Sequence, residues 1–331
     1  MDKLVTRAYN RFDVDHRRGI MRKISATERL KDEIIYYHIL NRDHAQQGIY
    51  FPRIIDSWYH GHGNDENWMD LELYSYNNVG KYLFSNELAM PSWADFFINL
   101  RDILLEFKDI TPLIPWSQEN IVTAARDMYI TKTEKEYQNF YDGWKDKFEC
   151  LFIDQIPNNL MYINGKEYRP FEIIWPEIKQ YIEENMLNFS PSLVHGDCCF
   201  SNILYGPDAN IIRFIDPRGS FGPKGIYGDI RYDVAKLYHS VDGTYEAFIT
   251  DKFKVTQSGN TFDLDIKDNG EITWAKNEFE YIFFPEFNKK EIKILQGCIF
   301  IGMCARHYDS LERQRAMYLT GTRLLNEALE L

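Results

Sequence analysis

Four polar residues in the middle of the chain have types and a spacing that could do chemistry. They are His195, Asp197, Asn202 and Asp216, all within residues 191–237. Carboxylate and amide oxygens are the ligands that Mg²⁺ takes from proteins, with waters and substrate phosphates completing its shell. A carboxylate beside a hydroxyl can also accept its proton. Together these groups would suit phosphoryl transfer from a nucleotide to an alcohol, which needs a metal and a group that positions the attacking oxygen.

The surrounding sequence predicts a hairpin that brings these groups together. The apolar run 203–205 and the alternating run 211–215 are predicted strands, with Gly, Pro and Asp between them at 206–208. A hairpin returns the chain to its starting end, so Asn202 should lie close to Asp216. Asp197 precedes Asn202 in a loop that must double back. We therefore expect Asn202 and Asp216 to hold the metal and Asp197 to act on the hydroxyl.

This spacing resembles the catalytic signature of the aminoglycoside phosphotransferase and choline kinase superfamily, whose fold is similar to that of protein kinases. The matching residues are His195-x-Asp197-x-x-x-x-Asn202, followed by Ile215-Asp216. By this resemblance Asp197 is the catalytic carboxylate. His195 belongs to the catalytic set as a structural residue, whose ring holds the loop and the backbone near Asp216.

Two departures from the protein-kinase pattern favour the small-molecule branch. Protein kinases carry H-R-D and D-F-G, whereas this chain has Gly196 in place of the Arg and Pro-Arg-Gly at 217–219. Segments 215–219 and 228–237 also resemble proteins linked to bacterial surface polysaccharide synthesis. Arg218 is a candidate contact for a phosphate or carboxylate group and is counted with the nucleotide-binding residues.

The resemblance implies a fold and two cofactors. The fold is the two-lobed, protein-kinase-like α+β fold, with a small mixed lobe that contains an antiparallel sheet and a larger, mostly helical lobe. The lobes are expected at residues 1–78, which bind nucleotide, and 79–331, which carry catalysis and the acceptor site. ATP and Mg²⁺ are the expected cofactors, and the site should lie in the cleft between the lobes.

The N-terminal pattern supplies the partners that this fold needs. Residues 19–25 alternate like a strand, and the apolar spacing after Ser25 and Thr27, either of which could cap it, predicts a helix. By the resemblance, Lys23 contacts the nucleotide phosphates and Glu33 is its partner on the helix, with Glu28 as a rival. A surface lysine and a solvated carboxylate are the alternative, because both are common on such faces.

The remaining nucleotide contacts are expected near the lobe junction. Runs 51–59 and 68–74 are predicted strands joined by a turn at 60–65. The end of the second run, from Glu72 to residue 76, resembles the link whose backbone reads adenine. A glycine-rich loop should cover the phosphates, yet residues 6–12 contain no glycine. This departure leaves open whether nucleotide binds in the usual way.

The rest of the chain predicts helices and one further hairpin. Apolar residues recur at helical spacing from residue 92 and through 123–140, 171–186 and from 289 to the C-terminus. Segment 253–266 alternates around a Ser-Gly-Asn turn, which predicts a β-hairpin. His307 and Asp309 lie between the last two helices and could either line the acceptor site or cap the junction.

Composition narrows the class of protein. The 331 residues are 44% hydrophobic and 15% aromatic, which is typical of a globular chain. A net charge of −12 argues against nucleic acid as a partner. Five cysteines without a C-x-x-C pair favour a reducing compartment, and no apolar run reaches the length of a membrane span. We expect a cytoplasmic protein without membrane insertion.

Three functions remain after these arguments. The leading one is a kinase that phosphorylates a hydroxyl of a sugar, polyol or amino-alcohol, and the resemblance to polysaccharide-linked proteins implies a role in capsule synthesis. The second is a protein Ser/Thr kinase, which Gly196 and Pro217 argue against. The third is a silent binding module that keeps the fold, which the glycine-free segment supports and the retained Asp197, Asn202 and Asp216 oppose. The sequence does not predict an oligomeric state.

Overall fold

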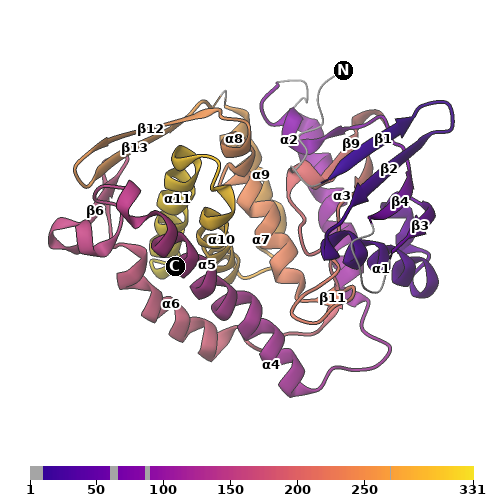
Figure 1. Ribbon diagram of the computed structural model, residues 1–331, viewed down its shortest axis with the longest axis horizontal. Helices are drawn as coiled ribbons and strands as arrows, with labels where there is room; N and C mark the ends of the chain where they lie inside the picture. Colours follow the sequence, from indigo (N-terminus) through magenta and orange to yellow (C-terminus); the bar gives the residue numbers. More distant parts are fainter. Residues whose placement is uncertain (1–9, 60–65, 86–89, 269) are drawn as a thin grey trace.

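The computed structural model describes residues 10–59, 66–85, 90–268 and 270–331. Its N-terminal part contains a four-stranded antiparallel sheet in the order β1-β2-β4-β3, and helix α1, Glu28–Asp43, contacts β3 and β4. Figure 1 shows this sheet and helix at one end of the molecule. The strands are β1 Arg11–Asp15, β2 Ile20–Ser25, β3 Ile54–Trp58 and β4 Asn67–Glu72. The predicted strands are therefore present, and the predicted turn at 60–65 lies outside the described residues.

Helix α1 forms where the sequence predicts it. Leu30, Ile34 and Tyr37 recur at helical spacing and are buried, so one face of the helix packs into the core. Thr27 occupies the N-cap position but makes no side-chain cap bond, and its hydroxyl instead lies 2.9 Å from that of Ser25. Burial of this face fixes the helix against the sheet, because removing an apolar side chain from water is favourable.

The connection between β1 and β2 is residues 16–19. Of the segment 6–12, where a glycine-rich loop was expected and no glycine is found, residues 6–9 lie outside the described residues. Residues 11 and 12 already belong to β1. Asp15 Oδ1 accepts hydrogen bonds from the backbone N–H groups of Arg17 and Arg18, at 3.0 and 3.1 Å, and Gly19 has φ +65°. Two backbone donors of this turn are thus bound to a carboxylate of the chain itself.

The C-terminal part is mostly helical, which confirms the predicted α+β fold class. Helices α4 and α5 run on through a π-helical turn at Asp127–Thr131, so the predicted helix 123–140 is longer than expected. Helix α9 was not predicted. The long helices are α3 Met90–Asp109, α4 Gln118–Arg126, α5 Lys132–Trp144, α6 Phe171–Asn185, α7 Ile230–Val241, α9 Glu271–Phe283, α10 Lys289–Cys304 and α11 Leu311–Leu329.

The predicted hairpin at 253–266 is present as β12 Phe253–Ser258 and β13 Thr261–Ile266. It is not isolated, because β13 pairs in parallel with β6, Met161–Ile163, which in turn pairs with β7, Lys166–Tyr168. Figure 1 shows this sheet at the end of the molecule opposite the N-terminal sheet. The sequence did not predict the parallel pairing, since it joins segments about a hundred residues apart.

The predicted central hairpin consists of β9, Ile203–Gly206, and β10, Ile211–Phe214. A third strand, β5, Asn77–Asn78, pairs with β9. The chain thus enters the C-terminal sheet just before the expected lobe boundary at 78/79, and this boundary stays a prediction. Among the described residues, no helix combines the length and apolar character that a membrane crossing needs.

Candidate active site

The hairpin holds the predicted catalytic groups in one hydrogen-bonded loop. The backbone N–H of Ile215 donates to the carbonyl of Asn202 at 2.9 Å, which ties the end of β10 to the start of β9. Asn202 Nδ2 donates to the carbonyl of Asp197, also at 2.9 Å. Asp216 follows with φ +58°, a left-handed conformation that turns the chain away from the strand. The loop therefore gathers Asp197, Asn202 and Asp216 as predicted.

The His195 ring lies between the two ends of this loop. Its Nε2 is 2.9 Å from the carbonyl of Ile215, and its Nδ1 accepts from the backbone N–H of Asp197 at 3.2 Å. Complete burial lowers the pKa of His195 to about 4, so the ring is neutral at pH 7. The neutral ring then carries its proton on Nε2, because Nδ1 is the acceptor.

Asp233 of α7 supports the same loop from behind. Its Oδ2 accepts from the N–H of His195 at 2.6 Å, and its Oδ1 accepts from the N–H of Gly196 at 2.7 Å. Burial raises the pKa of Asp233 to about 7, against the two N–H donors that lower it. Asp229 has a different place, since it caps α7 and pairs with Arg231 at 2.6 Å.

Gly196 stands where protein kinases carry an arginine, and the structure gives a steric reason for it. Gly196 has φ +80°, and a Cβ there would lie 2.8 Å from the Cβ of Arg218. The backbone N–H of Arg218 donates to the carbonyl of His195 at 2.8 Å, which fixes this close approach. The glycine is therefore required both by the left-handed backbone and by the packing of Arg218.

Lys23 lies between two carboxylates from different parts of the chain. Its Nζ is 2.7 Å from Glu33 Oε2 and 2.6 Å from Asp216 Oδ1. Burial lowers the pKa of Lys23, but the charges of Glu33 and Asp216 outweigh it and raise the pKa overall. The rival Glu28 contacts Lys31 and Lys224 instead.

The neighbouring cation confirms the predicted strand geometry. Arg22 points to the opposite side from Lys23 and pairs with Asp70 at 2.6 Å. Successive strand residues alternate between the two faces of a sheet. Lys23 is thus on the buried side and Arg22 on the more exposed one.

Lys236 of α7 was not assigned a role from the sequence. Its Nζ lies 2.8 Å from Asp197 Oδ1, and its side chain is only 7% exposed. The charge of Asp197 raises its pKa, against the effect of burial. A lysine within the apolar helical run 234–237 was the available signal, because a buried lysine needs a charged partner. The identity of that partner could not be read from the run.

Three further residues singled out from the sequence, Glu72, His307 and Asp309, contact residues other than Asp197, Asn202 and Asp216. Glu72 ends β4, and its Oε2 accepts from the Tyr74 hydroxyl at 2.9 Å. Of the residues between the last two helices, Asp309 pairs with Arg313 at 2.9 Å, and the His307 ring lies 6.4 Å from that of Tyr245. Tyr245 is also 5.8 Å from Lys236 Nζ.

The donor atoms of Asn202 and Asp216 fit a hard divalent metal ion. The amide nitrogen of Asn202 is used by the Asp197 carbonyl, and its Oδ1 accepts no hydrogen bond from any described residue. The Asp216 side chain is 45% exposed, so a carboxylate oxygen can be reached from solvent. One amide and one carboxylate oxygen, completed by phosphates and water, match the coordination of Mg²⁺. Among the described residues, no cluster of three His, Cys, Asp or Glu side chains could hold a metal by itself.

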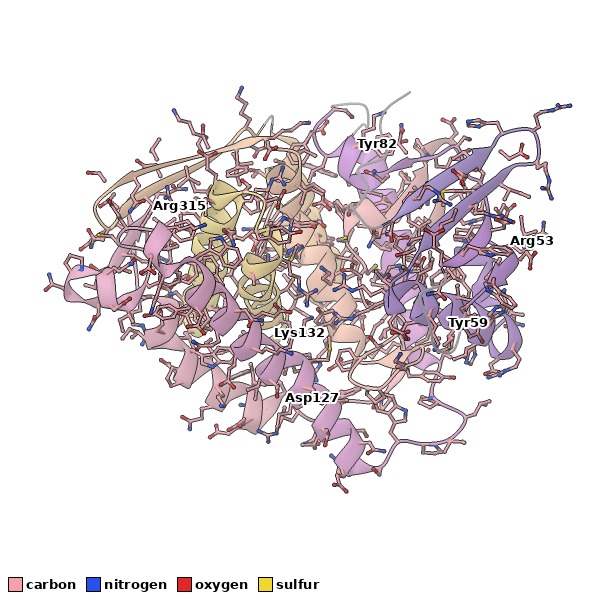
Figure 2. All side chains as sticks on the ribbon, in the orientation of Figure 1. Arg53, Tyr59, Tyr82, Asp127, Lys132 and Arg315 are labelled. Atoms are coloured by element: carbon pink, nitrogen blue, oxygen red, sulfur yellow. The ribbon has the colours of Figure 1, made fainter. Side chains whose placement is uncertain are left out.

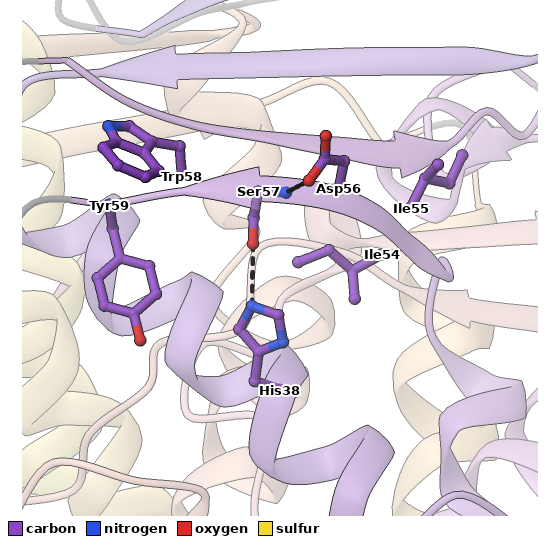
Figure 3. Close-up of a pocket in the computed structure, with 7 residues that line it drawn as sticks. All are labelled: His38, Ile54, Ile55, Asp56, Ser57, Trp58 and Tyr59. Carbon is purple, nitrogen blue, oxygen red and sulfur yellow. Dashed lines mark hydrogen bonds between the residues drawn. The ribbon is translucent and has the colours of Figure 1, made fainter.

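A pocket on the N-terminal part is lined by residues other than those of the candidate active site. It lies between α1 and β3, where His38 Nε2 is 2.9 Å from the Ser57 hydroxyl, as Figure 3 shows. Its lining consists of His38 and residues 54–59, which include none of the predicted site residues. The pocket is therefore separate from the candidate active site.

Comparison with solved structures places this arrangement in a known fold. An aminoglycoside phosphotransferase solved as a GDP complex matches at TM-score 0.54 and 10% identity, over 99% of this chain and 90% of that one. The chain has the kinase-like fold of the aminoglycoside phosphotransferases. An amicoumacin kinase solved with AMP-PNP and Ca²⁺ matches at TM-score 0.51 and 12% identity, over 98% and 87%. No protein-family model and no curated protein sequence matches the chain.

Proposed function

We propose that this chain is a phosphotransferase that moves the terminal phosphate of ATP to a hydroxyl of a small molecule. The observation that carries the proposal is the pairing of both loop carboxylates with buried lysines. Asp216 pairs with Lys23 from the N-terminal sheet, and Asp197 pairs with Lys236 from α7. Charges held in place before substrate binds are what phosphoryl transfer needs.

Each residue then has a defined task. Asp197 accepts a hydrogen bond from the acceptor hydroxyl and takes its proton, while Lys236 keeps this carboxylate charged and in place. Lys23, held by Glu33, binds nucleotide phosphates. Asn202 and Asp216 would hold Mg²⁺, which neutralises phosphate charge when it is bound. His195 and Asp233 keep the loop in position without contacting the reacting atoms.

The ligands of the structural neighbours support the nucleotide and the metal. One neighbour is described as a GDP complex and another as a complex with AMP-PNP and Ca²⁺. We assign nucleotide binding to residues 1–78 with the link after Glu72, and acceptor binding to residues 79–331. A cytoplasmic location, a sugar, polyol or amino-alcohol acceptor, and a role in capsule synthesis complete the proposal.

One observation favours the silent binding module as a second candidate. The β1–β2 turn binds its own N–H groups through Asp15, so these donors are not offered to a phosphate. The turn also carries the exposed residues His16, Arg17 and Arg18, which are of types that bind phosphate. A catalytic function is favoured over a binding module because Asp197, Asn202 and Asp216 are all present, and each makes a hydrogen bond or ion pair within the site.

Nucleotide binding is the first experiment. The midpoint of thermal unfolding should rise with ATP plus Mg²⁺, and with either ATP or metal alone much less, because a ligand that binds only the folded state stabilises it. Asp216→Ala should remove the metal-dependent part, while Asp208→Ala, at the exposed turn of the same hairpin, should keep it. Absence of any shift with ATP, GTP or ADP would favour the silent module.

A further inference from the structure

Three cations gather around one buried tyrosine beside Asp197. The hydroxyl of Tyr232 lies 3.1 Å from Lys132 Nζ and 3.5 Å from Arg218 Nη1. Lys236, which contacts Asp197, stands one helical turn after Tyr232 on α7, so the two side chains share a face of that helix. Figure 2 labels Lys132 in the middle of the molecule, where α4 runs on into α5.

The charges of this cluster are not balanced by the protein. Lys236 has Asp197 as its partner, but no described carboxylate lies within 4.0 Å of Lys132 or Arg218. Arg306, also near Lys132, is paired with Glu136 at 2.6 Å. The Tyr232 hydroxyl is therefore the side-chain partner that Lys132 and Arg218 share among the described residues.

The same excess of positive charge acts on the pKa of Tyr232. Tyr232 is 4% exposed, and burial by itself raises its pKa. Lys132, Arg218 and Lys236 outweigh this effect and lower the pKa of Tyr232 to about 8. For Lys132, burial and the charges of Arg218 and Arg306 lower the pKa to about 8, so a bound anion would stabilise its charged form.

We propose that the acceptor is itself an anion, a small hydroxyl compound whose phosphate or carboxylate group is bound by Lys132 and Arg218. This inference rests on the proposed phosphotransferase function and narrows its acceptor. The arginine supplies a planar fork for two oxygens and the lysine supplies a compact charge. The anion would lie about one helical turn, roughly 6 Å, from the lysine that contacts Asp197, which leaves room for a short carbon chain between anion and reacting hydroxyl.

A cationic acceptor is disfavoured by the same geometry. An ammonium group placed beside Lys132 and Arg218 would meet like charges in a largely buried setting, where repulsion is weakly screened. Amino-alcohols and aminoglycosides are therefore poor candidates, whereas sugar phosphates and sugar acids are good ones. The positive site is the more distinctive because the whole chain carries a net charge of −12.

Matched pairs of compounds test the proposal. Binding of glucose 6-phosphate, gluconate and glycerol 3-phosphate is compared with binding of glucose, glycerol and glucosamine by calorimetry, with AMP-PNP and Mg²⁺ present. We expect at least one anion to bind tenfold or more tightly than its neutral twin. Lys132→Met and Arg218→Met should each remove most of this difference, and Lys132→Arg should restore part of it.

Lys135→Met is the matched control, because Lys135 is an exposed lysine on the same helix. It should keep the preference for the anion, and thermal unfolding checks that all variants are folded. The proposal is overturned if no anion binds more tightly than its neutral twin, if glucosamine binds best, or if Lys132→Met keeps the preference.

Nucleotide binding is measured in a separate arm, with AMP-PNP and Mg²⁺ alone. If AMP-PNP with Mg²⁺ does not bind, the phosphotransferase function itself is contradicted. The preference for anions and its dependence on Lys132 are then measured with the nucleotide-free protein. Each proposal can therefore be contradicted without the other.

Discussion

The two sides of the candidate site differ in whether their buried cations are paired with carboxylates. On the N-terminal side, Lys23 is held between Glu33 and Asp216 at 2.7 and 2.6 Å. On the C-terminal side, Lys132 and Arg218 share the hydroxyl of Tyr232, and no carboxylate of the described residues lies within 4.0 Å of either. A cation with built-in partners keeps its place before any ligand arrives, whereas a cation without a carboxylate is stabilised by an anionic ligand. The difference indicates that Lys23 is held in place before a ligand binds, whereas Lys132 and Arg218 favour ligands that carry negative charge.

The largest expected effect is at Asp197, which pairs with Lys236 of α7. Asp197→Ala should lower the turnover number about a thousandfold, since general-base catalysis typically contributes two to four orders of magnitude. The affinity for AMP-PNP with Mg²⁺ should stay within a few-fold, because Lys23 and Asp216 are untouched. ADP release in a coupled assay measures the first quantity and calorimetry the second. Normal turnover by this variant would refute the assignment.

A pair of lysine variants tests the contrast directly through stability. Lys23→Met leaves Glu33 buried without its cation, which should lower the free energy of unfolding by about 3–5 kcal/mol. Lys132→Met removes a cation that has no carboxylate partner, and should leave stability unchanged or slightly higher. Urea unfolding of both variants beside the wild type gives the comparison. Equal losses in the two variants would contradict it.

Lys236 should have a smaller effect on turnover. Lys236→Met removes the cation 2.8 Å from Asp197, and we expect turnover to fall tenfold to a hundredfold, about 1.4–2.7 kcal/mol. The Michaelis constant for ATP should change little, because the proposed contact with the nucleotide phosphates is made by Lys23 and not by Lys236. Lys290→Met, a substitution on α10, is a control for loss of charge. If Lys236→Met changed only the Michaelis constant for ATP, Lys236 would act in nucleotide binding and not through Asp197.

The smallest effect is spectroscopic. One tyrosine should ionise near pH 8, seen as absorbance at 295 nm, because Lys132, Arg218 and Lys236 together overcome burial and lower the pKa of Tyr232. Tyr232→Phe should abolish this step, and Lys132→Met should move it to higher pH. The folded pKa is below the unfolded value near 10, so the unfolded state binds more protons between pH 8 and 10. This tyrosine therefore adds stability as pH rises through that window.

The catalytic loop was predictable because its contacts are local. The spacing of His195, Asp197 and Asn202, and the turn before residue 211, place the loop groups by the geometry of one hairpin. The Lys23 and Glu33 pair is also local, because a strand followed directly by its helix leaves few alternative partners. Periodicity was enough to find α1 and α6, since each buries one apolar face. Helices α10 and α11 were also predicted, although α10 is buried on all sides from Ile292 to Gly302.

The position of the β1–β2 turn and the pairing of β5 with β9 were decided only by the tertiary structure. Residues 11 and 12 became strand because they pair with β2, a contact that the sequence around them does not specify. β5 is too short to show any period, so its pairing could not be predicted.

The sequence by itself determined the kinase-like fold, the identity of the three loop groups and the helix that carries Glu33. Only the tertiary structure decided that Lys236 faces Asp197 and that Lys132, Arg218 and Tyr232 meet. Lys132 begins α5, Arg218 lies in the loop after β10 and Tyr232 lies on α7, so Lys132 is a hundred residues away in sequence from the tyrosine that it contacts. Short-range spacing fixes contacts within a hairpin or helix, whereas the meeting of distant elements depends on how the whole core packs.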